Sequence, residues 1–287
     1  MYLQNISPDS LDSETTSPKL VVTYKFPLSS SARPPPIILE PLSLGGSREI
    51  LNFSSLVSKE PKLEEILSGL KGPWSLSFID KSKILVTEKQ GNFFLADLKN
   101  KNLSKINHNL NILVDGQGGL LEVLYSNDNV FVSYSENRGK GKSSTSVARA
   151  SFNKKELKFK NIFSAEPPIN SGYHFGSRLV IKDNLLYITA GERGAGMIAQ
   201  DPTKHPGSII RIHLDGKIPK DNPKFKGKEN WLPEIFQIGV RNPQGMDLSP
   251  FDNKIYLTNH GAKGGDWFGE VIFGENYGWK ILGWGGT

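Results

Sequence analysis

The residues of this chain that are best able to do chemistry lie in short, glycine-rich segments. His174 follows a glycine turn in SGYHFG (171–176), and an imidazole, whose pKa lies near neutrality, suits a general base. Arg241 and Asn242 are neighbours in VRNPQG (240–245), and a permanently charged guanidinium beside an amide suits an oxyanion or a carbonyl oxygen. From these residues alone two alternatives stay open: a turn histidine bonded to the backbone, and a structural arginine that caps carbonyl groups.

A second set of residues has the chemistry of a ligand or cation site. NHGAKGGDW (259–267) combines His260, three glycines and Asp266. Backbone carbonyls exposed in such a loop, with a carboxylate beside them, are the oxygen ligands that calcium prefers. Gln117 lies in the glycine-rich bend GQGGLLEV, where the backbone can approach a ligand closely. A tight turn with a solvent-facing amide is the alternative interpretation of Gln117.

Two further features limit the chemistry. GERG (191–194) holds Glu192 and Arg193 between glycines, and this pattern most simply indicates an ion-paired turn. The chain has no cysteine, so it forms no disulfide and no thiolate metal site, and its histidines match no zinc-binding spacing.

The elements that must position these residues recur along the chain. Each unit has an apolar strand, a turn built on Asp, Asn or Ser, and a β-branched or aromatic strand, and its copies start at residues 74, 120, 178 and 244. A further strand often follows, as in NFFLADL, TSVARASF and SIIRIHLDG. Several strands in a repeat of about 40–50 residues are typical of a β-propeller, whose insertions collect on one face. We therefore expect an all-β propeller with about four to five blades in this chain.

Composition and charge exclude several classes of protein. The chain has 287 residues, 29 of them glycine and 18 proline, which favours a turn-rich β architecture over a helical bundle. Its net charge of +6 comes with lysines spread through loops, which indicates a solvated surface rather than a nucleic-acid interface. No apolar run approaches the ~20 residues of a membrane span, and the N-terminus lacks the pattern of a signal peptide.

The N-terminal part of the chain has a different amino-acid composition. Residues 1–46 are rich in Ser, Thr and Pro, which predicts a flexible leader. PKLEEILSGL (61–70) is interpreted either as a local helix or as an edge strand.

Together, the motifs resemble one known family. GLKGPWSLSF, VTEKQG, GQGGLLEV, HFGSRL, AQD, DGKIPKDNP, IGVRNPQGM, HGAKGGD and NYGW occur in this order from about residue 63 to residue 287. The chain is similar to the soluble pyrroloquinoline-quinone (PQQ)-dependent sugar dehydrogenases, the glucose/sorbosone dehydrogenase family, and above all to their aldose sugar dehydrogenase branch. The resemblance implies a six-bladed β-propeller fold, here over residues 47–287 and incomplete at the C-terminal end.

The resemblance also implies an activity and a set of site residues. The enzyme would oxidise the anomeric carbon of an aldose to a lactone, with hydride passing to PQQ. His174 would act as the general base, and Arg241 would stabilise the charge that develops on the reduced quinone; both would also contact PQQ. The other implied contacts are to PQQ, by Gln117, Asn242 and His260, and to calcium, by Gly261, Ala262 and Asp266.

The chain departs from the family in two places. Trp267 stands where the family has a glutamate that helps to hold a structural calcium, so that site is left open. The family continues for roughly two blades beyond residue 287, and its Lys and Arg residues that clamp the cofactor carboxylates lie there. The family implies a periplasmic or secreted location, although no signal peptide is visible.

Two other functions are possible on the sequence alone. The chain would be a catalytically impaired propeller fragment that serves as a binding or interaction protein, or a calcium-dependent lactonase. A lactonase needs a full set of acidic ligands, whereas the sequence offers Glu192 and Asp266.

Overall fold

The computed structural model describes residues 64–223 and 230–282, and the chain divides into two compact units, Met1–Ser68 and Gly69–Thr287. The leader expected for residues 1–46 lies outside the described residues. Residues 64–70 form neither helix nor strand, so neither structure expected for 61–70 occurs in its described part. All strands of the described chain belong to the second unit.

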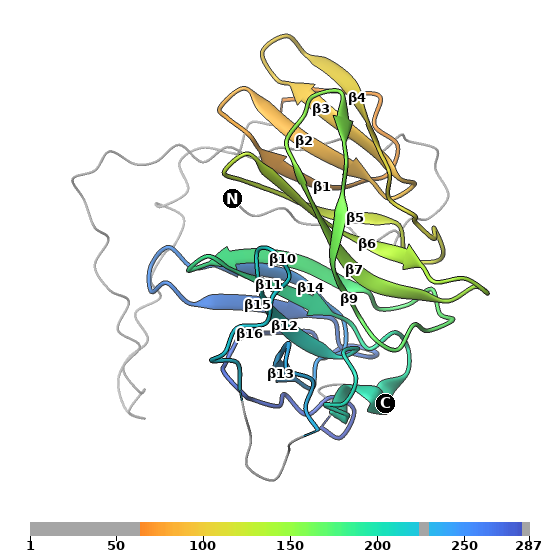
Figure 1. Ribbon diagram of the computed structural model, residues 1–287, viewed down its shortest axis with the longest axis vertical. Coiled ribbons are helices and arrows are strands. Elements are labelled where there is room, and N and C mark those ends of the chain that lie inside the picture. Colours follow the sequence, from red (N-terminus) through yellow and green to blue (C-terminus); the bar gives the residue numbers. More distant parts are fainter. Residues whose placement is uncertain (1–63, 224–229, 283–287) are drawn as a thin grey trace, which may run out of the picture. The chain divides into compact units, whose positions relative to one another are not determined.

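The first two sheets of this unit follow each other along the chain and are almost wholly antiparallel (Figure 1). The first sheet contains β1 (Pro73–Phe78), β2 (Lys83–Glu88), β3 (Asn92–Asp97) and β4 (Asn102–His108), and the two-residue β8 (Glu156–Leu157) pairs with β4 in parallel. The second sheet contains β5 (Leu120–Ser126), β6 (Asn129–Asn137), β7 (Ser143–Ser151) and β9 (Lys160–Ser164).

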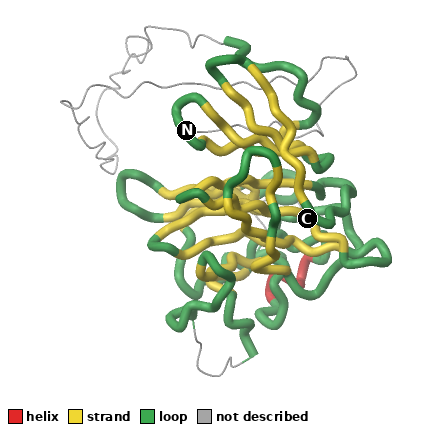
Figure 2. Tube along the Cα trace, turned by 45° about the horizontal axis from the view of Figure 1, so that its top comes forward, coloured by secondary structure: helices red, strands yellow, loops and turns green. Residues whose placement is uncertain are grey.

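Two more antiparallel sheets complete the described chain. The third sheet contains β10 (Gly176–Lys182), β11 (Leu185–Ala190), β12 (Ser208–His213) and β13 (Ile235–Ile238), and the fourth contains β14 (Pro243–Leu248), β15 (Ile255–Asn259) and β16 (Trp267–Glu270). Within the described residues the only helix is a short 3-10 turn, η3 (Gly196–Gln200), so strands and loops dominate Figure 2. No helix among these residues is long and apolar enough to cross a membrane.

The first two strands of each sheet are the strand pairs predicted from the repeated unit. β5 and β6 are joined by Asn127 and Asp128, and β10 and β11 by Asp183 and Asn184; all four residues have φ between 47° and 60°. Two-residue hairpin loops with left-handed residues twist in the same sense as the strands they join, and Asn and Asp tolerate that conformation. The turn chemistry visible in the sequence therefore sets the register of these hairpins.

Three hydrophobic cores lie between the four sheets. Strand residues point alternately to the two faces, so each inner sheet contributes to two cores. For example, Val132 of β6 packs toward the first sheet with Leu85, whereas Phe131 packs toward the third sheet with Leu186. A third cluster joins Ile209 and residues of the fourth sheet. This stack of small twisted sheets, in which each inner sheet is covered on both faces, is how propeller blades pack.

The first strands of the four sheets meet through one arginine. Arg178 of β10 forms an ion pair with Glu122 of β5, donates from Nε to the Gln244 carbonyl of β14, and lies over the Trp74 ring of β1, with 4.5 Å from Cζ to the ring centroid. Four strands that meet side chain to side chain are the inner strands of the blades. The expected β-propeller fold is confirmed, with four blades in the described residues.

The connections divide between the two ends of the blades. Because first and second strands are antiparallel, the start of each first strand and the end of each second strand lie at the same end. The segments before β10 and β14 and after β11 and β15 therefore gather there, and they contain the residues singled out by the sequence. We call this end the site end.

Candidate active site

His174 sits in the segment that leads into β10, and three contacts fix it. Its φ is 51°, an uncommon conformation for a residue other than glycine. Its backbone N–H donates to Gln117 Oε1 at 2.8 Å, and its ring Nδ1 lies 2.5 Å from Glu192 Oε1. The side chain is 12% exposed. A left-handed backbone held by neighbouring side chains is often found at functional sites.

Glu192 is the partner that the sequence did not identify. It follows β11, is buried, and accepts a second hydrogen bond through Oε2 from the Gly196 N–H at 2.6 Å. Its own N–H donates to the Arg241 carbonyl at 2.8 Å. Glu192 therefore links His174 of one blade to the Arg241 segment of the next.

The prediction that Glu192 and Arg193 form an ion pair within the turn at 191–194 is wrong. Glu192 pairs with His174, whereas Arg193 turns its guanidinium to backbone carbonyls. Arg193 Nε donates to the Tyr173 carbonyl at 2.9 Å, Nη1 to the Ser143 carbonyl at 2.8 Å, and Nη2 to Ser143 Oγ and the Ser171 carbonyl. Two of those carbonyls belong to the segment that carries His174.

Arg193 is thereby a buried clamp on the His174 segment. Its Cζ lies 3.7 Å from the centroid of the Phe175 ring, and burial lowers its pKa to about 10. At neutral pH the guanidinium stays charged, and its donors are satisfied by carbonyl oxygens rather than by a carboxylate. Arg193 acts on His174 by fixing residues 171–175, not by reaching the reacting atoms.

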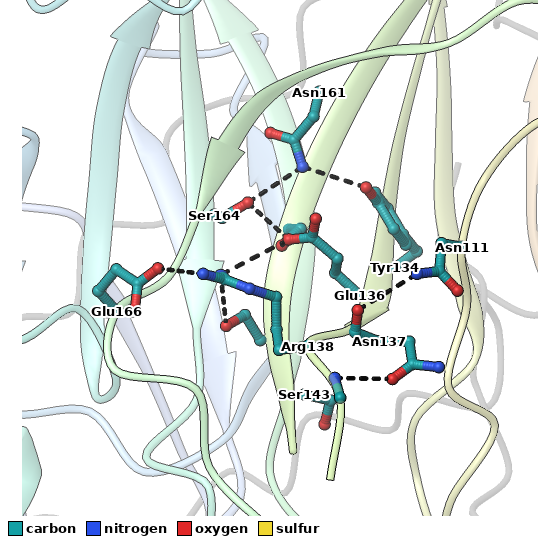
Figure 3. A network of polar contacts seen from close by, with 12 residues as sticks. Asn111, Tyr134, Glu136, Asn137, Arg138, Ser143, Asn161, Ser164 and Glu166 are labelled. Atoms are coloured by element: carbon teal, nitrogen blue, oxygen red, sulfur yellow. Dashed lines mark hydrogen bonds and ion pairs between the residues drawn. The ribbon is translucent and has the colours of Figure 1, made fainter. Parts of the chain in front are cut away.

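A polar network on the second blade supports the same clamp (Figure 3). Arg138 Nη2 lies 2.6 Å from Glu166 Oε1, and Glu136 Oε2 accepts hydrogen bonds from Ser146 and Ser164. Burial and the nearby Glu136 charge raise the pKa of Tyr134 to about 12. These contacts order the end of the β6–β7 hairpin, where Ser143 meets Arg193.

Arg241 and Asn242 lie directly before β14 and are positioned through Asn259. Both backbone N–H groups donate to Asn259 Oδ1 at 3.0 Å. Asn242 is buried, and its Oδ1 accepts the Gly176 N–H at 3.0 Å, which ties it to the start of β10. The Asn242 carbonyl accepts the His260 N–H at 3.2 Å. The two residues are thus locked to the neighbouring segments.

The Arg241 guanidinium is only lightly bonded. Nη1 donates to the His260 carbonyl at 3.3 Å, and Cζ lies 5.4 Å from the centroid of the Trp279 ring. Burial lowers the pKa of Arg241, against the opposing effect of the Glu192 and Asp266 charges. Most of its donors remain available to an external oxygen, so the carbonyl-capping alternative describes only part of what this side chain can do.

The residues predicted to bind calcium lie in the loop after β15. Asp266 Oδ1 accepts the Gly261 N–H at 2.8 Å, and Oδ2 lies 3.6 Å from His260 Nδ1. A Cβ on Gly261 would lie 2.3 Å from the Gly264 carbonyl oxygen, so the tight loop requires glycine there. The carbonyls of Gly261 and Ala262 accept no backbone hydrogen bond from the described chain. Within residues 64–223 and 230–282 no cluster of three acidic, His or Cys side chains exists, so a cation here would depend on carbonyl oxygens.

Gln117 is not the solvent-facing amide of the alternative interpretation. Its Oε1 accepts the His174 N–H, and its N–H donates to the Gly172 carbonyl at 2.7 Å. A Cβ on the preceding Gly116 would lie 2.5 Å from that same carbonyl oxygen. The glycine-rich bend is therefore a close fit to the His174 segment.

The structure thus joins the five residues predicted to contact the cofactor into one connected group. Hydrogen bonds connect Gln117, His174, Asn242, Arg241 and His260, directly or through one residue. The sequence reasoning missed three members of the group, namely Glu192 as the histidine partner, Asn259 as the backbone anchor, and Trp279 beside Arg241. Asn259 ends the second strand of its repeated unit, and Glu192 lies just after the second strand of another. This position in the repeat was the signal that could have identified both residues.

Known proteins share this fold and these segments. The sequence profile of the family described as Glucose / Sorbosone dehydrogenase matches residues 70–287. Aldose sugar dehydrogenase YliI of Escherichia coli (strain K12) is 34% identical over 233 residues, which cover 78% of this chain and 62% of that protein. Quinoprotein glucose dehydrogenase B of Acinetobacter calcoaceticus is 27% identical over 267 residues, which cover 79% of this chain and 54% of that protein. A crystal structure of glucose dehydrogenase, 34% identical, superposes with a TM-score of 0.74 and covers 78% of this chain and 67% of its own. The chain therefore spans less than two thirds of the length of these two curated relatives.

Proposed function

Since the chain belongs to the glucose/sorbosone dehydrogenase family, we propose that it oxidises an aldose at the anomeric carbon, with PQQ as hydride acceptor. The observation that carries the proposal is the His174–Glu192 pair at the site end. His174 Nδ1 lies 2.5 Å from Glu192 Oε1, and the Glu192 backbone N–H donates to the Arg241 carbonyl. A histidine oriented by a buried carboxylate is the arrangement that a general base needs.

His174 would remove the proton of the anomeric hydroxyl. Glu192 Oε1 can only accept a hydrogen bond while ionised, so the pairing assigns the ring proton of His174 to Nδ1. The lone pair of Nε2 is then available as the base. His174 would take the hydroxyl proton on Nε2; with PQQ as the acceptor of the C1 hydride, the sugar would lose two electrons and two hydrogens and become a lactone.

The side chains around His174 fit a planar quinone that carries carboxylates. Arg241 has free donors, and the side-chain oxygens of Asn242 and Gln117 accept hydrogen bonds within the protein, so their amide nitrogens are the groups that would donate to a ligand. When bound, PQQ supplies an electrophilic carbonyl carbon that accepts hydride. Arg241 would bind the neighbouring quinone oxygen, where negative charge develops, because a guanidinium stabilises an oxyanion in a partly buried site.

Calcium is the proposed partner of the quinone. The carbonyls of Gly261 and Ala262 are hard oxygen ligands, and Asp266 adds negative charge at the loop. His260 completes the proposed cofactor contacts, and its carbonyl already meets Arg241. The lactonase alternative is less well supported, because its all-acidic ligand set does not occur in the described residues. The periplasmic or secreted location stays a prediction from the resemblance.

Reconstitution tests the proposal. The purified chain is loaded with calcium and PQQ, bound cofactor is measured by absorbance after gel filtration, and sugar oxidation is followed with an artificial electron-accepting dye. We expect stoichiometric PQQ and dye reduction that depends on an aldose. PQQ retention without any dye reduction would favour the non-catalytic binding protein, and failure to retain PQQ would contradict the proposal.

A further inference from the structure

Trp279 and Lys280 lie at the site end and have no role in the chemistry described above. The backbone N–H of Trp279 donates to the Gly239 carbonyl at 3.1 Å, directly before the Arg241 segment. Two cations approach its ring: Arg241 Cζ lies 5.4 Å from the ring centroid and Lys280 Nζ lies 5.7 Å from it. One indole thus brings a second positive charge to the neighbourhood of Arg241.

Lys280 also reaches the segment that orients His174. A Cβ on Gly196 would lie 3.6 Å from Lys280 Cδ, so the lysine stem passes over Gly196. The Gly196 N–H donates a hydrogen bond to Glu192 Oε2, and Glu192 Oε1 is hydrogen-bonded to His174 Nδ1. Lys280 therefore lies beside Gly196, whose N–H binds the carboxylate that orients His174.

Within the described chain, neither cation has a carboxylate of its own. Among these residues no carboxylate oxygen lies within 4.0 Å of Lys280 Nζ or of the Arg241 guanidinium. Trp279 Nε1 is buried and has no hydrogen-bond partner in the same part of the chain. Unpaired like charges near one ring repel each other and are stabilised by an anion between or beside them. A buried indole N–H without a partner likewise lacks an acceptor.

We propose that Lys280, together with Arg241 and Trp279, forms an anion site that binds a carboxylate of the quinone cofactor. This inference rests on the proposed function, because PQQ is a planar aromatic tricarboxylate whose charge needs cationic partners. The lysine acts as a point charge on a flexible stem and Arg241 acts as a planar donor, while the Trp279 ring lies beside both cations. The chain then carries a carboxylate-binding lysine within its fourth blade segment, at residue 280.

Equilibrium dialysis of PQQ against the full chain, with calcium present, tests the inference. Lys280→Ala is compared with Lys81→Ala, which removes one exposed lysine from the β1–β2 turn at the opposite end of the blade. We expect Lys280→Ala to raise the Kd about five- to tenfold, the effect of losing a partly exposed charge-assisted contact. Lys81→Ala should leave the Kd unchanged, and Lys280→Arg should restore most of the affinity.

Salt dependence supplies a second readout that does not require activity. Because exposed charge pairs are screened by salt, the fall in affinity between low and high ionic strength should be shallower for Lys280→Ala than for the unchanged chain. Equal Kd values and equal salt slopes for Lys280→Ala and the unchanged chain would overturn the inference and leave the proposed function standing. If the unchanged chain binds no PQQ at all, both the inference and the proposed function are overturned.

Discussion

Replacing Glu192 by Gln exchanges one carboxylate oxygen for an amide nitrogen at the centre of the site. Both neighbours of this carboxylate are donors: His174 Nδ1 at 2.5 Å from Oε1, and the Gly196 N–H at 2.6 Å from Oε2. Glutamine has one acceptor oxygen and one amide nitrogen, so it can satisfy only one of these two donors. When its oxygen takes the backbone N–H, the amide nitrogen faces His174 and favours the imidazole tautomer whose proton lies on Nε2. That tautomer has no lone pair for the sugar hydroxyl.

The size of the expected loss follows from the role of the base. A positioned general base contributes about 10²–10⁴ in rate, and each factor of ten corresponds to about 1.36 kcal/mol of transition-state stabilisation. We expect Glu192→Gln to lower kcat by at least about 100-fold, or about 2.7 kcal/mol. PQQ affinity should change little, because the buried Glu192 side chain is directed at His174 and Gly196 rather than at the ligand.

Dye-linked steady-state kinetics of the reconstituted chain measure this loss. Glu156→Gln, an exposed substitution on β8, is the matched control and should keep full kcat. Circular dichroism and PQQ titration show whether the variant is folded and loaded. If a folded, loaded Glu192→Gln variant retains kcat within about threefold, the carboxylate does not orient the base, and the reasoning from general-base catalysis by His174 is wrong.

Three other substitutions probe the supports of the site. Arg193→Lys keeps the charge but not the planar set of donors, and should lower the free energy of unfolding by about 2–4 kcal/mol in urea titration; an unchanged midpoint would contradict the clamp. Gly191→Ala would place a Cβ 2.1 Å from the His174 carbonyl oxygen, so the segment must move and turnover should fall about 100-fold; unchanged turnover would show that the segment adapts freely. The His205 ring holds the pKa of Glu234 below its ordinary value of 4.5, so this contribution to stability is complete above pH 4.5 and is lost as the pH falls through the folded-state pKa. Glu234→Gln should therefore be less stable than the unchanged chain at pH 6, with the difference shrinking in acid; a constant difference would contradict the pairing.

The repeated strands could be predicted from the sequence because their signals are local. Alternating apolar residues and Asn–Asp turns, such as Asn127–Asp128, determine a hairpin without help from distant parts of the chain. The glycine-rich segments also identified the residues that gather at the site end. The local pattern at 61–70 gave no helix or strand in its described part, residues 64–70, although Leu67 and Leu70 are buried, because so short a run does not form a stable helix by itself.

The partners within the site depend on contacts between blades. Glu192 precedes Arg193 in the sequence, and an ion-paired turn is the simplest local interpretation of that dipeptide. The fold instead brings His174 to Glu192 and the carbonyl of Ser143 to Arg193. Trp279 meets Arg241 across 38 positions of sequence. No local spacing rule predicts such pairs.

A single-turnover experiment tests the central claim that His174 is the base. Chains loaded with calcium and PQQ are mixed with excess aldose in a stopped-flow instrument, and cofactor reduction is followed by absorbance for the unchanged chain and for His174→Asn. We expect both chains to bind PQQ with similar affinity, while the reduction rate of His174→Asn falls by about 10²–10⁴. Equal reduction rates in the two loaded chains would show that His174 is not the base.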